Sequence, residues 1–191
     1  MTMHDVREVW GLEQQVFTCP WSVHAFEYEV RHNPMAHFVI VRPRPAVAPV
    51  HQPTLIGNRL LSGSAAKETT PLVGYGGYWL IVDEAHVCTL AVHPSWRGMG
   101  LGELLLHSLL LQATALKAAV ATLEVRVSNR VAQQLYRKYT FAEAGLRKGY
   151  YQDNHEDALI MTTEILASAE FQTRFQANRT ALYQRLQARA S

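Results

Sequence analysis

Residues 95–106, "SWRGMGLGELLL", carry a glycine at every second position from Gly98 to Gly102 and then continue into leucines. Glycine inside a helix or a strand costs about 0.5–1 kcal/mol relative to alanine, so three glycines where a helix should begin require a reason. The stretch follows an apolar run, "TLAVHP", that is typical of a strand. A strand, a loop without side chains and a helix in this order predict that an anion lies against the backbone.

A phosphate or a pyrophosphate is the anion that suits such a backbone. The first N–H groups of a helix are unpaired and carry partial positive charge, and glycine lets the anion approach without a Cβ in the way. Arg97 would add a charge-assisted contact. Neither common nucleotide motif fits, because no lysine follows Gly102 and the glycines are spaced two and two rather than as G-x-G-x-x-G. The glycines alone leave a tight loop without a ligand as the alternative.

The composition of the 191-residue chain, 48% hydrophobic and 18% charged, is typical of a soluble globular protein. A net charge of +2 is too small to indicate a nucleic-acid partner. Cys19 and Cys88 form no CxxC pair, which favours a reducing cytoplasm over a disulfide framework. The N-terminus is charged, unlike a secretory signal, and no apolar run approaches the roughly 18 residues of a membrane span. We therefore expect a cytoplasmic protein without a membrane or direct nucleic-acid partner.

Hydrophobic periodicity predicts a mixed order of helices and strands, which favours an α+β or mixed α/β sheet with helices on both faces. Helices are expected over residues 5–16, 22–31, 100–117 and 129–139. Strands are expected over residues 36–42, 73–82, 85–94 and 121–129, with two more in 142–165 joined by the polar tip 152–156. Residues 166–191 read as a further helix, packed on its own domain or against a partner, in which one face is shared by Phe171, Phe175, Leu182 and Leu186.

The domain organisation that follows is one domain over residues 1–165 and a C-terminal helical extension over 166–191. Residues 43–72 hold five of the eight prolines, followed by a Gly/Ser/Ala patch. Because the chain on either side reads as two strands of one sheet, this Pro-rich segment is interpreted as an insertion in the domain rather than as a linker. It is either a hairpin tip or a flap for a substrate or partner.

Three groups of residues resemble a known family. "VHPSWRGMGLGELLL" resembles the acetyl-CoA loop of the GNAT acetyltransferases, whose Arg/Gln-x-x-Gly-x-Gly/Ala pattern is met by Arg97, Gly100 and Gly102. "LEVRVSNRVAQQLYRKYTF" is similar to the second half of that family's coenzyme site. "CPWS", "LEVRVSN" and "GYYQDNHEDALIM" resemble the RimI-type ribosomal-protein-alanine N-acetyltransferases, which acetylate protein N-termini. The resemblance covers about residues 5–163, without the insertion and the tail.

The resemblance implies a GNAT-like α/β (α+β) fold, with a mixed, mostly antiparallel central sheet and helices on both faces. It also implies acetyl-CoA as cosubstrate. The backbone at 90–92 would hold the pantetheine arm, as in strand addition, and the glycine loop would hold the pyrophosphate. The implied coenzyme contacts are Leu90, Ala91, Val92, Arg97, Gly98, Met99, Gly100, Leu101, Gly102, Glu103, Asn129 and Tyr136.

For catalysis, the resemblance implies that Glu124 is the general base and Tyr136 the general acid. An α-amine with a pKa near 8 must lose a proton before it attacks, and we expect partial burial to raise the pKa of Glu124 into the useful range. The departing thiolate then needs a proton, which a phenol held close can supply. Tyr136 lies two helical turns after Asn129, so both can face one coenzyme. Acetyl transfer would be direct, in a ternary complex.

Aromatic residues and histidines complete the candidate site residues. Trp21, Tyr150 and Tyr151 stand in segments that resemble the peptide-groove loops of the family, although they are equally typical of core or hairpin aromatics. Neither His93 nor His155 has a partner at ligand spacing. We therefore expect no metal site.

Two features depart from the family pattern. The family usually begins with a strand before its first helix, but only four residues precede Asp5, so we expect that strand to be missing or very short. The helix after Tyr136 usually ends in Gly-Phe, and here the pair is Thr140-Phe141. Because a β-branched residue tolerates a positive φ poorly, we expect a different turn there.

The leading functional hypothesis is acetylation of the N-terminal α-amine of a protein or peptide, with ribosomal proteins as candidate substrates. A second hypothesis is an acetyltransferase that acts on a lysine or a small amine. A third is a non-catalytic CoA-binding module that uses its tail and insertion for partners. The presence of Glu124, Asn129 and Tyr136 argues against the third, and the "CPWS" and "GYY" segments favour the first over the second.

Overall fold

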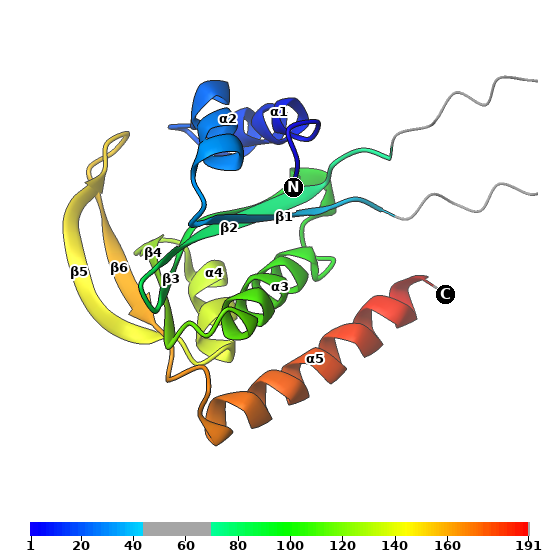
Figure 1. The fold of residues 1–191 in the computed structure, drawn as a ribbon, viewed down its shortest axis with the longest axis vertical. Coiled ribbons are helices and arrows are strands. Elements are labelled where there is room, and N and C mark those ends of the chain that lie inside the picture. Colours follow the sequence, from blue (N-terminus) through cyan, green and yellow to red (C-terminus); the bar gives the residue numbers. More distant parts are fainter. Residues whose placement is uncertain (44–69, 191) are drawn as a thin grey trace, which may run out of the picture.

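The computed structural model describes residues 1–43 and 70–190, so most of the expected insertion at 43–72 lies outside the described residues. Its elements follow the mixed order that the sequence predicts (Figure 1). In chain order they are α1 (Val6–Val16), α2 (Val23–His32), β1 (Ala36–Val41), β2 (Gly74–Ile81), β3 (Glu84–Val92), the 3-10 helix η1 (Pro94–Trp96), α3 (Leu101–Ala115), β4 (Val120–Arg126), α4 (Arg130–Lys138), β5 (Ala142–Tyr151), β6 (Glu156–Thr162) and α5 (Ala169–Ala190).

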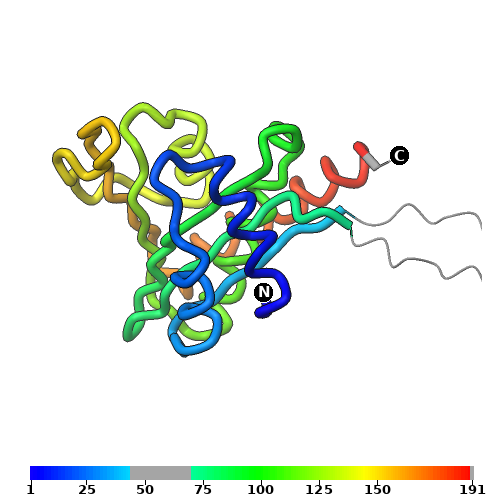
Figure 2. Tube along the Cα trace, turned by 90° about the horizontal axis from the view of Figure 1, so that it is seen from above, coloured from blue at the N-terminus to red at the C-terminus, as the bar shows by residue number. Residues whose placement is uncertain are grey.

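The strands form one six-stranded sheet in the order β1-β2-β3-β4-β6-β5. Only β3 and β4 pair in parallel, and the other neighbours are antiparallel. Helices α1 and α2 cover one face, while α3, α4 and α5 lie on the other (Figures 1 and 2). The expected mostly antiparallel sheet with helices on both faces is therefore confirmed. The β5–β6 hairpin and the C-terminal end of α5 lie at opposite ends of the molecule.

The parallel contact between β3 and β4 is short. It runs over four residue pairs, from Glu84–Val120 to Val87–Leu123, after which β3 pairs only with β2, and β4 with β6. At the same level Gly77 pairs with Thr89 and Tyr78 with Val87, so Cys88 is the extra residue of a β-bulge. Beyond Val87 the edge of β3 that faces β4 is therefore left without a strand partner.

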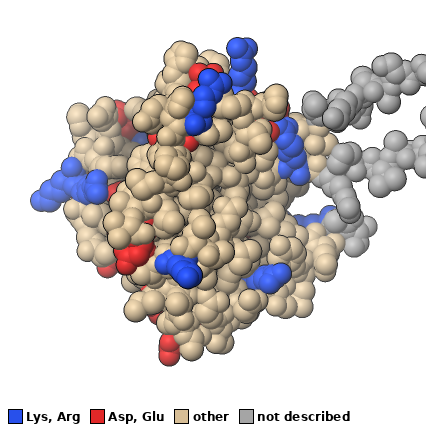
Figure 3. Space-filling view, viewed as in Figure 1, with Lys and Arg blue, Asp and Glu red and all other residues tan. Residues whose placement is uncertain are grey.

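The tail packs on its own domain. Phe171, Phe175 and Leu182 of α5 are buried, and the first two belong to the core formed by α3 and the sheet. Phe175 also stacks on the buried His107 of α3, with ring centroids 4.2 Å apart. This burial explains the shared apolar face that the sequence shows. On the face seen in Figure 3, charges of both signs are scattered and form no single-sign patch.

The helix ends follow from local hydrogen bonds. The Ser22 hydroxyl accepts from the Ala25 N–H and caps α2, as expected. Strand β4 ends at Arg126 rather than at the expected Asn129, because Asn129 instead caps α4 through the Ala132 N–H. No strand precedes α1 within the described residues, and the N-terminal ammonium of Met1 donates to the Phe38 carbonyl of the edge strand β1 at 3.2 Å. None of the described helices combines the length and the apolar character of a membrane span.

The expectation of a different turn after α4 is wrong. Thr140 has a φ of +66°, the left-handed conformation that glycine would adopt there. The turn is held because the Phe141 N–H donates to the Tyr136 carbonyl at 3.1 Å and the Phe141 ring is buried. The Thr140 hydroxyl is also buried, without a hydrogen-bond partner among the described residues. Tertiary packing therefore imposes a conformation that this residue disfavours.

Thr140→Gly should stabilise the protein. A non-glycine residue in this conformation costs about 1–3 kcal/mol, and the entropy of glycine in the unfolded chain offsets part of that gain. We expect a net increase of about 1 kcal/mol in the free energy of unfolding, measured by urea denaturation. Thr140→Ala removes the orphan hydroxyl but keeps the positive φ, so it should gain less. A less stable glycine variant would show that the turn is not strained.

Candidate active site

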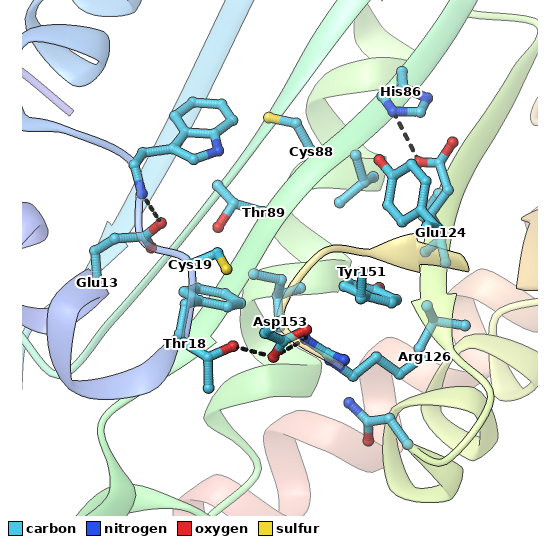
Figure 4. A pocket seen from close by; sticks show the side chains of 18 of the residues that line it. Glu13, Thr18, Cys19, His86, Cys88, Thr89, Glu124, Arg126, Tyr151 and Asp153 are labelled. Atoms are coloured by element: carbon cyan, nitrogen blue, oxygen red, sulfur yellow. Dashed lines mark hydrogen bonds and ion pairs between the residues drawn. The ribbon is translucent and has the colours of Figure 1, made fainter. Parts of the chain in front are cut away.

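A pocket of about 650 Å³ opens where β3 and β4 diverge. Its walls come from the α1–α2 loop, β2, β3, β4, α4 and the β5–β6 hairpin (Figure 4). Of the residues predicted from the sequence, it brings together Trp21, Leu90, Glu124, Asn129, Tyr136, Tyr150 and Tyr151. The glycine loop at 97–102 lies outside this lining, as do Ala91 and Val92. The structure thus gathers both predicted proton-transfer residues at one strand divergence.

Glu124 lies on β4, its side chain only 7% exposed, between a histidine and an arginine. Its Oε2 is 3.1 Å from His86 Nε2, and its Oε1 is 3.1 Å from Arg147 Nη2. The hydrogen bond with His86 lowers the pKa of Glu124, with a further contribution from the charge of Arg147, and together they outweigh the effect of burial. The expectation that burial would raise this pKa is therefore wrong, and the carboxyl group stays ionised at neutral pH.

His86 on β3 is a site residue that the sequence reasoning missed. Its Nδ1 is 3.2 Å from the hydroxyl of Thr122, the residue paired with it on β4, and that hydroxyl in turn donates to Glu84. The ring stacks on Trp79 at 6.1 Å between centroids. The contact with Glu124 raises the pKa of His86. A strand pairing that joins distant segments creates this cluster, so no local spacing signals it.

Tyr136 lies on α4, and Asn129 is the residue that immediately precedes this helix. Burial raises the pKa of Tyr136 to about 12, so the phenol keeps its proton across the physiological range. The Asn129 Oδ1 is used to cap α4, which leaves the Nδ2 group as its free donor within the described part of the chain. The buried Gln133, also missed, holds the preceding loop by donating from Nε2 to the carbonyls of Arg126 and Val127, both at 2.9 Å.

The glycine loop has the open backbone that the sequence predicts. Gly98 and Gly100 have φ angles of +75° and +88°, and a Cβ on Gly98 would meet nothing within 4 Å. Among the described residues, the amides of 98–103 donate to no backbone carbonyl. The Arg97 side chain folds back, with Nε 3.3 Å from the Val92 carbonyl. The loop is therefore a cradle of unpaired N–H groups at the start of α3.

Helix α5 holds this loop through two arginines, a contact that the sequence analysis did not predict. Arg189 donates to the Gly98 carbonyl at 2.7 Å, and Arg185 pairs with Glu103 at 2.7 Å. Lys138 of α4 forms an ion pair with the other carboxylate oxygen of Glu103. The Glu103 side chain is thus held by two cations, and its backbone N–H donates to no backbone carbonyl among the described residues. The loop conformation depends on three elements rather than on its glycines alone.

At the end of the pocket opposite Glu124, the buried carboxyl group of Glu13 supports the α1–α2 loop (Figure 4). Glu13 accepts from the Trp21 N–H at 2.9 Å through Oε1 (Figure 4). Its Oε2 accepts from the Tyr75 hydroxyl. The residue is only 2% exposed. Burial raises the pKa of Glu13 to about 7, opposite in direction to Glu124 in the same pocket. Sequence reasoning placed Glu13 only in an amphipathic helix.

The loops that frame this end are tied together. The Thr18 hydroxyl of the α1–α2 loop donates to Asp153 in the β5–β6 hairpin, and Arg126 contacts both oxygens of Asp153 at 2.8 and 2.9 Å. The Arg126 guanidinium also lies 3.8 Å from the centre of the Tyr151 ring. Within the described residues, no three His, Cys, Asp or Glu side chains are grouped as a metal site would need.

Comparisons with known proteins show which family the chain belongs to. The model of the acetyltransferase (GNAT) family matches residues 8–141. A Bacillus subtilis protein provisionally named [ribosomal protein bS18]-alanine N-acetyltransferase is 34% identical over 165 residues, 86% of this chain and 93% of the relative. The Mycobacterium tuberculosis N-alpha-acetyltransferase RimI is 33% identical over 163 residues, 84% of this chain and 87% of the relative. The crystal structure of the Escherichia coli ribosomal-protein-S18-alanine N-acetyltransferase superposes with a TM-score of 0.69 at 25% identity, covering 89% of this chain and 94% of that one.

Glu13→Gln should change how stability depends on pH. Because the folded pKa of Glu13 is about 7 and its ordinary value 4.5, the native state binds more protons between these pH values. Wild-type stability therefore falls as pH rises through this window, and the neutral glutamine should abolish that loss. We expect the variant to be more stable by about 3 kcal/mol at pH 8 and equal at pH 4 in urea unfolding. The exposed Glu164→Gln is the control, and parallel wild-type and variant profiles would refute the protonation of Glu13.

Proposed function

Because the chain belongs to the GNAT acetyltransferase family, we propose that it transfers the acetyl group of acetyl-CoA to the N-terminal α-amine of a protein. The relatives named for ribosomal protein bS18 support a ribosomal protein with an N-terminal alanine as the substrate. The observation that carries the proposal is the placement of Glu124 and Tyr136 in one pocket, at the point where β3 and β4 separate. We assign the catalytic domain to residues 1–165 and treat 166–191 as an extension that braces the glycine loop.

The residues present fit acetyl-CoA. The unpaired amides of 98–103 suit a diphosphate, and the unpartnered edge of β3 at Leu90, Ala91 and Val92 suits the amide groups of a pantetheine arm. The free Nδ2 group of Asn129 donates into the same pocket. When bound, the coenzyme supplies an activated thioester. The protein supplies the position, the proton acceptor and the proton donor.

Two residues would assist the transfer: one accepts the proton of the amine, and the other donates a hydrogen bond to the leaving sulfur. Glu124 is ionised at neutral pH and takes the proton that the attacking amine loses, directly or through water. Tyr136 is protonated at the same pH and donates its O–H to the departing sulfur. Because its pKa of about 12 exceeds the value near 8.5 of an ordinary cysteine thiol, full proton transfer is uphill. Tyr136 therefore stabilises the developing negative charge mainly as a hydrogen-bond donor.

The part of the pocket between the α1–α2 loop and the β5–β6 hairpin would receive the acceptor peptide. Trp21, Tyr150 and Tyr151 line it, and the Thr18–Asp153 hydrogen bond joins its two framing loops. Because the Thr18–Asp153 hydrogen bond joins the two loops, only the first residues of a peptide would pass between them and come close to Glu124. This arrangement supports the N-terminal amine over the alternatives of a lysine or a small amine.

A peptide panel tests the substrate class. Each sequence is offered with a free N-terminus and no lysine, or with a blocked N-terminus and one lysine, and products are located by mass spectrometry. We expect label on the free N-terminus, strongest when alanine is first. Glu124→Gln should lower turnover about 10²–10⁴-fold while leaving acetyl-CoA binding unchanged by calorimetry. Label on lysine alone would replace the proposal with the lysine alternative.

Gly100→Val tests the coenzyme cradle. A β-branched residue cannot hold a φ of +88° without strain, so the loop should refold and withdraw its amides. We expect the affinity for acetyl-CoA to fall at least about tenfold in calorimetry, since several charge-assisted hydrogen bonds are lost together. Gly11→Val, at a helical position with nothing within 4 Å, is the matched control for fold and affinity. Unchanged affinity in a folded Gly100→Val protein would place the diphosphate elsewhere.

A further inference from the structure

His86 contacts Glu124, the proposed base, through Nε2, and part of its side chain is exposed to solvent. Its side chain is 23% exposed, whereas that of Glu124 is 7% exposed. We propose that His86, acting through Glu124, stores the proton that the acceptor amine loses, so that the working base is the His86–Glu124 pair rather than the carboxylate alone. This inference rests on the proposed acetyl transfer. It makes His86 a positioning and proton-storing residue, while Glu124 remains the group that meets the substrate.

The hydrogen bonds of Thr122 fix the tautomer of His86. The Thr122 hydroxyl gives its proton to Glu84, so its oxygen can only accept from the imidazole. Neutral His86 therefore carries its proton on Nδ1 and has a lone pair on Nε2, so the 3.1 Å contact between Nε2 and Glu124 Oε2 is a hydrogen bond only once the pair has taken up a proton. That lone pair is placed to receive a proton from the carboxyl group. The doubly protonated imidazolium is equally well satisfied, since both of its N–H groups then face acceptors.

The charges around the imidazole come from three strands and one helix. Glu84 of β3 lies 3.9 Å from Nδ1 and, like Glu124 of β4, favours the imidazolium. Arg147 of β5, on the other carboxylate oxygen, opposes it. The Trp79 ring lies between the imidazole and the helix α2, where Trp79 Nε1 donates to Glu29. Tyr150 of β5 is also close to Glu124 and is neutral at the working pH.

The proton balance of the step is simple. The attacking nitrogen forms its bond to the acetyl carbon and releases one proton to Glu124, directly or through a water molecule. Glu124 passes this proton to Nε2 of neutral His86, which leaves a carboxylate beside an imidazolium. The imidazolium then loses its Nε2 proton to a water molecule in the pocket, which restores the neutral Nδ1–H form of His86. No oxidant or further reactant is needed, and Glu124 is ionised again for the next turnover.

A pH dependence follows, with a definite sign. The pair accepts a proton only while His86 is neutral, and its contact with Glu124 raises the pKa of His86 above the ordinary value. Turnover at saturation should therefore fall as pH decreases through a midpoint above 6.5, the ordinary value for histidine. A carboxylate acting alone would instead keep its activity down to a pH no higher than the ordinary glutamate pKa of 4.5.

Kinetics of His86→Gln test the pair. We expect kcat at pH 8 to fall about tenfold or more, with the KM for peptide changed less than about threefold, because only proton removal is impaired. The acid limb of the kcat profile should move down by more than about one pH unit, toward the range of a carboxylate. His24→Gln, at an exposed histidine on α2, is the matched control and should leave the profile unchanged. An unchanged profile in His86→Gln, with or without a loss of kcat, would overturn the inference and leave His86 a packing residue.

A second measurement needs no substrate and so separates this inference from the proposed function. The 15N signals of the His86 ring, assigned by their loss in His86→Gln, should titrate in the wild type above pH 6.5 and in Glu124→Gln at a lower pH. Near neutral pH the Nδ1–H tautomer should be the neutral form. If His86 titrates identically in both proteins, the pair does not exist. If the peptide panel shows another acceptor amine while His86 titrates as expected, the substrate class is wrong and the kinetics are repeated on that amine.

Discussion

The early end of the parallel pairing between β3 and β4 is the constraint on which the site depends. Two parallel strands that stay in register leave no room between them for a ligand. Here the ladder stops at Val87–Leu123, and the bulge at Cys88 turns β3 away while β6 holds β4 in place. The gap between the strands exposes an unpaired backbone edge on one side and Glu124 on the other. Both requirements of an acyl transfer, a channel for a long thioester arm and a proton acceptor beside its end, arise from this one irregularity.

Much of this could be predicted from the sequence because its signals are local. The alternation in 121–129, the Ser22 cap and the glycines before α3 each specify structure within a few residues. The structure confirms the cap and the start of α3, and it confirms the strand as far as Arg126. The family resemblance placed Glu124, Tyr136 and the aromatic loop residues in one pocket, where the structure also puts them. What could not be predicted depends on contacts between distant segments. The pKa of Glu124 is lowered rather than raised because His86, from another strand, is its partner, and Thr140 adopts a left-handed turn because Phe141 is buried.

The two buried carboxyl groups of the pocket show how environment separates residues of one type. Glu124 has a histidine and an arginine against it and stays charged. Glu13 has only neutral donors, a backbone N–H and a phenol, and its pKa moves toward neutrality. The first is suited to exchanging protons, and the second to holding Trp21 and its loop in place. A reading based on residue type alone would treat the two as interchangeable.

Helix α5 ends with its arginines on the carbonyl of Gly98 and the carboxylate of Glu103. The same short loop is thus shared between the C-terminal helix and the proposed nucleotide. Free-energy coupling is reciprocal, so a coenzyme that prefers the braced loop must strengthen the attachment of the helix by the same factor. If the coenzyme has this preference, amide exchange in the last turns of α5 should slow when the coenzyme binds.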